Sequence, residues 1–361
     1  MYLARFKNLA NMKKKLVWSL LAVLALTLTF CDRSDDIGPA KKRDYAEQYT
    51  KDSTDIETFL KTHTYTVINH PGFSDDQDVT FTEVPAGTAG VIWDELGTNL
   101  LSRTVHTYRD EDETIPYTLY YLKLRQGGGQ NNDRPKPTNT DKVLAAYTGK
   151  YMFHLETTDE DTGEVIDSLK TYEFESQAFP QTQFDLQQVI RGWSEIFPLF
   201  NAGDPNQVEG EPTLYTDFGA GVMFIPSGLG YYNQALGSIP AYSPLIFTFK
   251  LLAVTHVDTD NDGIPDYLED RDGDGYMYII LNDEGTGEMR PDDIDGDGAP
   301  NYLDLDDDGD NVLTETEFLS DPNDNDSEPL TWETVPDCSG NTTDPNRLRR
   351  FYNPACTGQE P

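Results

Sequence analysis

The stretch "FDLQQVIRGW", Phe184 to Trp193, decides how the middle of the chain folds. It reads as the end of a strand followed by one short helical turn. The turn finishes on tryptophan, the largest side chain, whose indole N–H usually needs a partner when it is buried. Trp193 is therefore either an ordinary core residue or the floor of a pocket, and the segments around it have to decide between these two interpretations.

The sequence on both sides of this turn predicts β structure. Alternating apolar residues predict strands in "YTLYYLKL" from Tyr117, in "KVLAAYTGKYMFHLE" from Lys142 and in "PLIFTFKLLAVTHV" from Pro244. Residues 44–63 have apolar residues at helical spacing, and residues 64–116 show short alternating runs. The predicted fold class is α+β: an antiparallel sheet that wraps a short helix, with an N-terminal helix and β extension.

Acidic residues concentrate towards the end of the chain. The 361 residues carry a formal net charge of −37, and 25 of the 64 Asp and Glu residues lie between 258 and 326. A charge of this sign argues against nucleic-acid binding, which needs a basic surface. A segment this acidic either binds cations or stays extended through self-repulsion.

Aspartates recur at alternate positions in four parts of this segment. "DTDNDGIPDYLE", residues 258–269, fits the calcium-loop pattern D-x-[DN]-x-[DN]-G-x5-E at every position, and residues 270–275, 293–304 and 306–317 repeat it in part. Calcium takes six to eight oxygen ligands, so we predict a loop-rich region that binds structural Ca²⁺; the alternative is a solvated acidic linker. The predicted ligands are Asp258, Asp260, Asp262, Asp266, Glu269, Asp270, Asp272, Asp274, Asp293, Asp295, Asp297, Asn301, Asp304, Asp306, Asp308, Asp310 and Glu317.

The first three of these loops follow one another without clear flanking helices. This chaining resembles thrombospondin type 3 and related bacterial repeats, in which the backbone wraps a row of ions. Residues 327–361 form a polar, Pro-rich tail, in which Cys338 and Cys356 can pair as a disulfide in an oxidising compartment.

The N-terminus reads as a targeting segment. Lys13 to Lys15 precede an apolar run from Leu16 to Phe30, which is too short to span a bilayer but suits a signal peptide. Cys31 follows directly, and this arrangement resembles a bacterial lipoprotein signal in which Cys31 is lipidated and anchors the chain to the membrane. The acidic run "DRSDD" after it is similar to the export signal of Bacteroidetes outer-membrane lipoproteins. We expect a cell-envelope lipoprotein of the outer membrane, on either its periplasmic or its surface-exposed face; the alternatives are an uncleaved anchor or a signal cut elsewhere.

Five segments in a fixed order carry a second resemblance. They are "VLAAYTG" at 143–149, "EVIDSL" at 164–169, "FDLQQVIRGWSEIFPLFNAGD" at 184–204, "FIPSGLGYY" at 224–232 and "SIPAYSPLIFTFKLLAV" at 238–254. Together they resemble the FKBP-type peptidyl-prolyl isomerases over about residues 117–257. Within them, "VIRGW" and "IPAYSPLIF" are the most specific parts.

The resemblance implies a role for each residue of a proline-binding pocket. Trp193 is the floor under the proline ring, Tyr231 and the backbone N–H of Ile190 donate hydrogen bonds to substrate carbonyls, and Asp167 lies at the rim, bonded to Tyr147. Asp167, Tyr231 and Trp193 are the predicted catalytic residues. The predicted substrate-binding residues are Tyr147, Ile166, Phe184, Val189, Ile190, Ile239 and Phe247.

Prolyl isomerisation is chemistry that such a pocket performs without a cofactor. The barrier of about 18–20 kcal/mol comes from the partial double bond of the amide, and that resonance is lost in the twisted transition state. A dry apolar site disfavours the polar planar ground state more than the twisted state, and this difference accelerates the reaction. We expect an isomerase that acts on Xaa-Pro segments of exported proteins and assists their folding.

Two other functions stay open on the sequence. Ile166 and Tyr232 depart from the family pattern, which favours a module that binds peptides without useful turnover. A calcium-stiffened spacer with a passenger domain is the other. The predicted organisation is a signal peptide at 1–31, a tether at 32–43, the N-terminal extension at 44–116, the isomerase-like domain at 117–257, the calcium-binding repeats at 258–326 and the tail at 327–361.

Overall fold

The computed structural model describes residues 42–110, 113–210, 212–278, 292–324 and 326–356. The predicted signal peptide, Cys31 and most of the tether lie outside these residues. Asp44–Pro361 forms one compact unit. Among the described helices, none combines the length and the apolar character that crossing a membrane requires.

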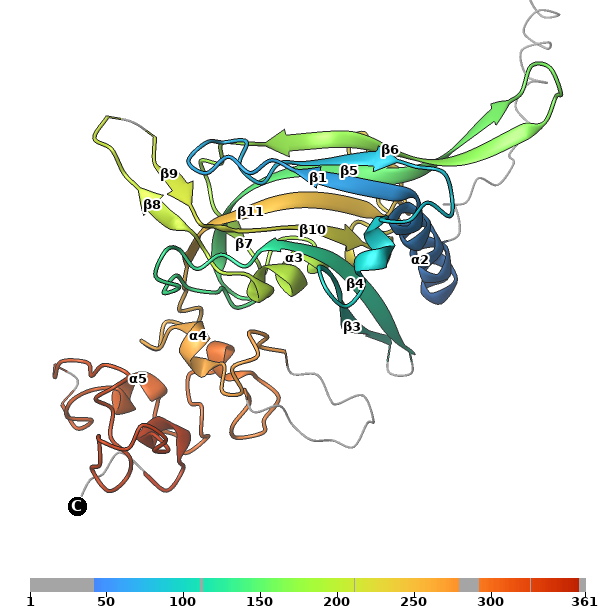
Figure 1. The fold of residues 1–361 in the computed structure, drawn as a ribbon. Coiled ribbons are helices and arrows are strands. Elements are labelled where there is room, and N and C mark those ends of the chain that lie inside the picture. Colours follow the sequence, from blue (N-terminus) through green and yellow to red (C-terminus); the bar gives the residue numbers. More distant parts are fainter. Residues whose placement is uncertain (1–41, 111–112, 211, 279–291, 325, 357–361) are drawn as a thin grey trace, which may run out of the picture. The chain divides into compact units, whose positions relative to one another are not determined.

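One antiparallel sheet of seven strands organises this unit (Figure 1). The strands run in the order β3-β4-β10-β11-β5-β6, and β7 pairs with β5. The strands are β3 (Leu100–Asp110), β4 (Glu113–Arg125), β5 (Lys142–Thr158), β6 (Val165–Gln177), β7 (Phe184–Asp185), β10 (Gly219–Ile225) and β11 (Leu245–Thr255).

Short helices and two small hairpins complete the fold. The predicted α+β class with an antiparallel sheet is confirmed, although the predicted domain boundary at residue 117 falls inside β4, so β3 belongs to the sheet. The other elements are α2 (Tyr45–Thr62), β1 (His63–Val67), β2 (Val79–Glu83), η1 (Ile92–Glu95), α3 (Arg191–Ile196), η2 (Phe197–Leu199), β8 (Asp204–Asn206), β9 (Leu214–Thr216), η3 (Ser227–Leu229), α4 (Asp266–Glu269), η4 (Asn301–Leu303), α5 (Thr314–Glu317) and η5 (Arg350–Tyr352).

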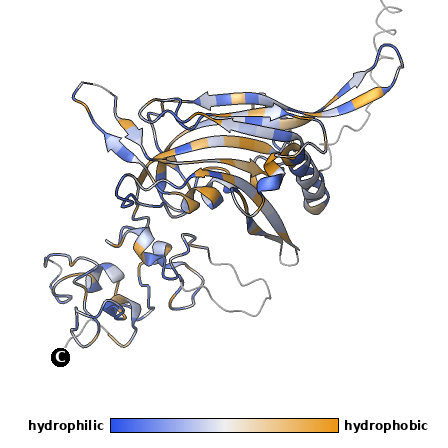
Figure 2. Cartoon of the chain, viewed as in Figure 1, coloured by the Kyte–Doolittle hydropathy of each residue, from blue (hydrophilic) through white to orange (hydrophobic). Residues whose placement is uncertain are grey.

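The sheet is apolar on both faces because both are covered. Successive residues of a strand point to opposite faces, so Met223 of β10 joins the core around α3, and Val222 and Phe224 join the core under α2. Helix α2 contributes Ile56 and Phe59 to that second core. Figure 2 shows the apolar colouring along β10 and β11 that this double burial requires.

Buried polar contacts also fasten α2 to the loop after β10. The Asp52 carboxylate, which is 1% exposed, accepts hydrogen bonds from the Ser227 backbone N–H at 2.7 Å and from the Ser227 hydroxyl at 2.6 Å. Gln48 donates to the same carboxylate at 2.7 Å. The N-terminal extension therefore covers the sheet and also holds η3, the turn that precedes Tyr231.

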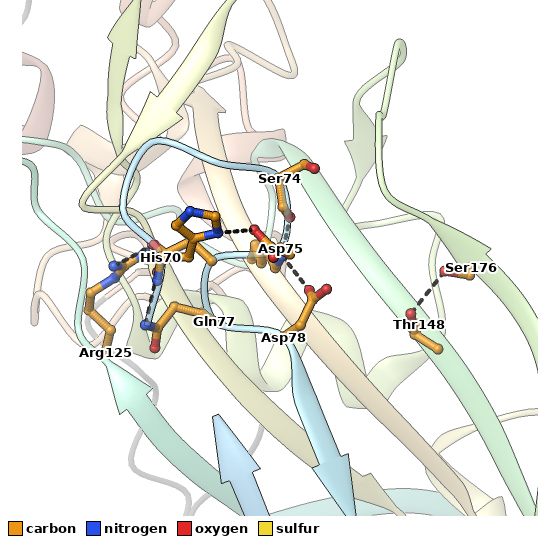
Figure 3. A network of polar contacts seen from close by, with 10 residues as sticks. His70, Ser74, Asp75, Gln77, Asp78, Arg125, Thr148 and Ser176 are labelled. Carbon is orange, nitrogen blue, oxygen red and sulfur yellow. Dashed lines mark hydrogen bonds and ion pairs between the residues drawn. The ribbon is translucent and has the colours of Figure 1, made fainter. Parts of the chain in front are cut away.

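A polar loop between β1 and β2 lies against the same side of the sheet (Figure 3). Lys250 of β11 donates to the Ser74 carbonyl at 2.6 Å and to Asp78 at 2.5 Å, and Arg125 of β4 forms an ion pair with Asp76 at 2.9 Å. A groove of about 320 Å³ separates the loop from β5, β6 and β11. These contacts attach the β1–β2 hairpin to the sheet.

The β5–β6 hairpin is long, with strands of 17 and 13 residues. Its turn is at Asp159–Gly163, where the Asp159 side chain accepts hydrogen bonds from the backbone N–H groups of Asp161 and Thr162. Strand β6 then runs back for 13 residues, so Tyr147 pairs with Gln177. This register decides which residues of β6 reach the aromatic site.

The residues after β11 form loops, the short elements α4, η4 and α5, and a small apolar lobe (Figure 1). The structure joins Cys338 and Cys356 through a disulfide in this lobe. Its buried core is Ile264, Phe318, Val335, Phe351 and Tyr352.

The second acidic loop contacts helix α3 directly. The Tyr276 hydroxyl donates to the Glu195 carbonyl at 2.6 Å, and the Arg103 guanidinium lies 3.5 Å from the centre of the Tyr276 ring. The Asn139 backbone N–H donates to the Gly275 carbonyl at 3.0 Å. The Asn139 side-chain oxygen accepts the Met277 N–H, also at 3.0 Å. The acidic segment therefore packs on the same helix that carries Trp193.

Candidate functional site

The first candidate site is a set of aromatic rings around Trp193. The Trp193 side chain is 4% exposed and lies at the start of α3. Tyr147, Phe184 and Phe247 approach it edge-on, with ring centres 5.0, 5.2 and 5.3 Å away and interplanar angles of 80°, 74° and 89°. Edge-to-face contacts of this kind are the favoured arrangement for aromatic pairs.

Local sequence explains why α3 comes so close to the sheet. Residue 192 is glycine, and a Cβ there would lie 2.6 Å from the Cδ1 atom of Ile225 on β10. Helix α3 follows Ile190, whose backbone is extended and whose carbonyl accepts the Trp193 N–H at 2.9 Å. The sequence "VIRGW" therefore places an aromatic ring at the point where the helix touches β10.

Phe174 and Glu175 complete the aromatic site, and neither was among the predicted site residues. Phe174 contacts Phe247 with ring centres 5.7 Å apart. The Tyr147 hydroxyl is hydrogen-bonded to Glu175, and burial together with this bond raises the pKa of Tyr147. Burial and the negative charge of Glu175 also raise the pKa of Tyr231. Glu175 is thus the carboxylate between the two tyrosines.

The structure does not bring Ile166 and Asp167 to Trp193. Ile166 is 47% exposed, and Asp167 pairs with Glu156, nine residues along β5 from Tyr147. The Asp167 carboxylate contacts His154 at 3.0 Å. The long hairpin moves these residues away from Trp193, and only knowledge of the turn position could have identified "FES" at 174–176 in their place.

The structure brings the other predicted site residues together. Ile239 is 4% exposed in the same core, and Val189, Ile190, Phe184, Tyr147 and Tyr231 pack against it. Tyr232, which departs from the family pattern, stacks on Tyr45 of α2 with ring centres 4.0 Å apart. It therefore contributes to the contact with α2.

Two N–H groups at this site have no acceptor within the described ranges. The Trp193 indole N–H is buried and lacks a hydrogen-bond partner there. The backbone N–H of Ile190, at the start of α3, also makes no hydrogen bond to the described residues. Polar groups at low exposure normally have partners, so these two N–H groups can donate hydrogen bonds to carbonyl groups of a ligand.

The second candidate site is the acidic segment, where carboxylates gather in five groups. In each group one oxygen per residue lies within 4.8 Å of the others. Four groups each come from a single loop at alternate positions, and the fifth joins Asp262, Glu269 and Asp307. The single-loop groups are Asp258–Asp260–Asp262, Asp270–Asp272–Asp274, Asp293–Asp295–Asp297 and Asp306–Asp308–Asp310.

Many of these carboxylates are buried without a partner. Both oxygens of Glu269, Asp307 and Glu317 are buried and lack a hydrogen bond to any described residue. Burial and neighbouring carboxylates raise the pKa of Glu269 to about 11 and that of Asp307 to about 9. Unpaired buried carboxylates are strongly unfavourable, so the donor set fits a bound divalent cation that prefers oxygen ligands.

Four predicted ligands lie outside these groups. One is Glu317, and the other three accept hydrogen bonds from neighbouring residues. Asp266 accepts hydrogen bonds from the Thr259 N–H and hydroxyl, at 2.8 and 2.7 Å. The Asn301 side-chain oxygen accepts the Ile294 N–H at 3.1 Å, and Asp304 accepts the Asp306 N–H at 3.0 Å. Asp307 was missed because the loop pattern assigns no ligand to the second position.

Comparison with known protein families matches the acidic segment and the tail. The family model described as "BamM C-terminal" matches residues 259–345. This match begins inside the first acidic loop and extends into the disulfide-linked lobe.

Comparison with curated proteins gives matches over about two fifths of the chain. The chain is 33% identical over 144 residues to the FKBP-type peptidyl-prolyl cis-trans isomerase FkpA of Aeromonas hydrophila. The aligned region covers 40% of this chain and 41% of that protein. It is 27% identical over 141 residues to the macrophage infectivity potentiator of Trypanosoma cruzi, covering 39% and 55%. The chain is thus similar to FKBP-type isomerases and spans about half the length of these relatives or less.

Solved structures of a peptidyl-prolyl cis-trans isomerase and of FkpA also match part of this chain. They include the peptidyl-prolyl cis-trans isomerase PPIase of Pseudomonas syringae, at 23% identity and a TM-score of 0.25, covering 38% of this chain and 75% of that one. FkpA of Escherichia coli is 24% identical with a TM-score of 0.25, covering 38% and 48%.

Proposed function

We propose that the aromatic site binds Xaa-Pro segments of polypeptides and accelerates their cis–trans isomerisation. The observation that carries this proposal is the ring arrangement, in which Tyr147, Phe184 and Phe247 stand edge-on around a buried Trp193. The similarity to FKBP-type isomerases over about two fifths of the chain supports the same activity. Neither argument requires a cofactor for the reaction.

Each residue of the site would have a separate role in this reaction. The proline ring packs on Trp193, and the surrounding rings exclude water, which disfavours the dipolar planar amide relative to the twisted state. The Ile190 N–H and the Tyr231 hydroxyl donate to carbonyls of the bound segment and hold it in place. Glu175, bonded to Tyr147, takes the rim position that the sequence analysis gave to Asp167.

The test is an isomerisation assay on Leu-Pro and Phe-Pro peptides, with two matched tryptophan variants. Trp193→Phe should lower the catalysed rate at least tenfold, because the largest surface under the proline is lost. Trp93→Phe replaces a tryptophan that packs against Tyr120 in the other core, and it should stay within about twofold of the parent protein. A parent rate equal to the uncatalysed background would refute the isomerase proposal.

The second candidate function is peptide binding with little turnover. The carboxylate at the rim is a glutamate, one methylene longer than the predicted aspartate, and it is already engaged by Tyr147. This arrangement leaves the apolar floor intact and changes the polar rim. Binding of the same peptides without acceleration of their isomerisation would identify this second function.

We also propose that the acidic segment binds calcium as a structural ion. The support is the set of buried carboxylate oxygens without partners, gathered in groups small enough for one cation each. The protein would then be a calcium-stiffened, lipid-anchored envelope protein of the outer membrane that presents the isomerase site to exported polypeptides. Mass spectrometry of the mature N-terminus tests the anchor, because the proposal requires an acylated Cys31.

A further inference from the structure

We infer that Asp262, Glu269 and Asp307 together hold one calcium-type cation that joins the first acidic loop to the fourth. The inference rests on the proposed calcium binding and adds a ligand that the loop pattern does not contain. Asp262 and Glu269 belong to residues 258–269, whereas Asp307 belongs to the loop of residues 306–317. We call these three residues the joining site.

The geometry of the joining site fits a single ion. One carboxylate oxygen from each of the three residues lies within 4.8 Å of the other two. Calcium binds oxygens at about 2.3–2.6 Å, so ligands on opposite sides of one ion are roughly 5 Å apart. The three carboxylates are therefore close enough together to contact one cation.

All three residues of the joining site are buried, whereas each single-loop group contains residues that are half-buried or exposed. Asp262, Glu269 and Asp307 are 3%, 0% and 1% exposed, whereas Asp272, Asp274 and their counterparts at 295 and 297 are exposed. Both oxygens of Glu269 and of Asp307, and Oδ2 of Asp262, have no hydrogen-bond partner within the described ranges. Three buried carboxylates in mutual contact repel one another, and solvent cannot reach them to relieve that repulsion.

The apolar lobe lies at the same junction. Ile264 of the first loop and Phe318, which follows the fourth, pack in one core with Phe351 and Tyr352. Tyr352 is close enough to the joining site that its pKa is raised by burial and by the charges of Asp307 and Glu269. A cation here therefore neutralises the charge beside the lobe and fixes the two loops from which its core is built.

The chemistry of the ligands selects the class of ion. All three donors are carboxylate oxygens, which hard divalent cations prefer over the softer nitrogen and sulfur ligands of zinc or copper. Loops with several flexible oxygen donors suit calcium better than magnesium, which demands near-ideal octahedral geometry.

The test is a calorimetric calcium titration of the chelator-treated full protein and two matched variants. Asp307→Asn keeps the shape of the side chain and removes its charge. Glu315→Gln removes a charge of the same sign from an exposed residue of the same loop, outside every carboxylate group. We expect Asp307→Asn to lose one binding event or to weaken one at least tenfold, and Glu315→Gln to stay within twofold.

Thermal unfolding supplies a readout that a purely structural role would not give. In calcium, Asp307→Asn should unfold at a lower temperature than the parent. In chelator, the same variant should be as stable as the parent or more stable, because it has lost a repulsive charge. Equal losses in both conditions, or calcium binding equal to that of Glu315→Gln, would overturn the joining site while leaving the other calcium sites in place. No calcium binding by the parent would overturn both proposals.

Discussion

Trp193 and Glu269 are both almost completely buried, 4% and 0% exposed, but they are buried in opposite surroundings. Neutral rings surround Trp193, and their burial is favourable at about 25 cal/mol per Å². Around Glu269 the charged neighbours are other carboxylates, first Asp307 and then Asp262. The aromatic region can therefore fold from its own residues, whereas the acidic region requires a positive charge that its own side chains do not supply.

Removal of calcium should produce the largest difference between the two regions. In chelator, protease cleavage within residues 258–317 should become at least tenfold faster, because bound ions contribute folding free energy directly. The sheet has two apolar cores that do not include the acidic segment. The midpoint of its thermal unfolding should therefore change by no more than a few degrees. Limited proteolysis with mass mapping, alongside calorimetry, measures both effects in one sample.

Magnesium provides the matched control for the chelation experiment. It should restore little protection, because it accepts flexible multi-oxygen loops less readily than calcium does. Identical cleavage patterns with calcium and with chelator would mean that residues 258–317 are a solvated linker.

The elements that the sequence predicted well are those that depend on local periodicity. Alternation of apolar residues identified β4, β5 and β11, and the spacing of Ile56, Phe59 and Leu60 identified α2. These patterns are sufficient because each reports which side of one element is buried. The pairing of one strand with another is not encoded in that way, so the predicted domain boundary at residue 117 cut the β3–β4 hairpin.

The misplaced site residues depend on long-range pairing. Ile166 and Asp167 were assigned to the site by resemblance, but the turn at Asp159–Gly163 places "FES" at 174–176 near Tyr147. Asp307 was missed for the same reason, because its partners Asp262 and Glu269 lie in another loop. In both cases the contact joins residues that are far apart in the sequence, and such a partner can be known only from the fold.

A pair of carboxylate variants sharpens the description of the aromatic site. Glu175→Ala should lower the isomerisation rate by about tenfold, because it removes the hydrogen bond to Tyr147 and the charge between the two tyrosines. Asp167→Ala should leave the rate within twofold. Equal effects of the two variants in the peptide assay would contradict the assignment of Glu175 to the rim.

The contact between the two regions should have a smaller effect. Tyr276→Phe removes the hydrogen bond to the Glu195 carbonyl, a loss of about 1 kcal/mol for a typical hydrogen bond. We expect the calcium-dependent stabilisation of the sheet to fall by about 2–4 °C in thermal midpoint. The matched variant Tyr267→Phe keeps a ring that stacks on His256 and should change the midpoint by less than about 1 °C. A midpoint for Tyr276→Phe that equals this control would show that the two regions fold independently.

The smallest expected effect concerns His154, which joins the β5–β6 hairpin to α2. Its ring nitrogens lie 3.0 Å from Asp55 of α2 and 3.0 Å from Asp167 of β6, and the hydrogen bond to Asp55, followed by the one to Asp167, raises the pKa of His154. The protonated form is favoured in the folded state, so this contact stabilises the fold fully below the unfolded pKa of about 6.5. The stabilisation is lost as the pH rises through the higher folded pKa.

The two regions should therefore respond to acid in opposite directions. Because His154 is half-exposed, solvent screening limits its contribution to less than about 1 kcal/mol. Calcium ligands must be deprotonated, so acid weakens ion binding in the acidic segment while it strengthens the His154 contact. Hydrogen exchange of the hairpin between pH 6 and 8, corrected for intrinsic rates, should show less protection at the higher pH in the parent protein and no such change in His154→Gln. Protection in the parent that is independent of pH would mean that the hairpin is held by its strand pairing alone.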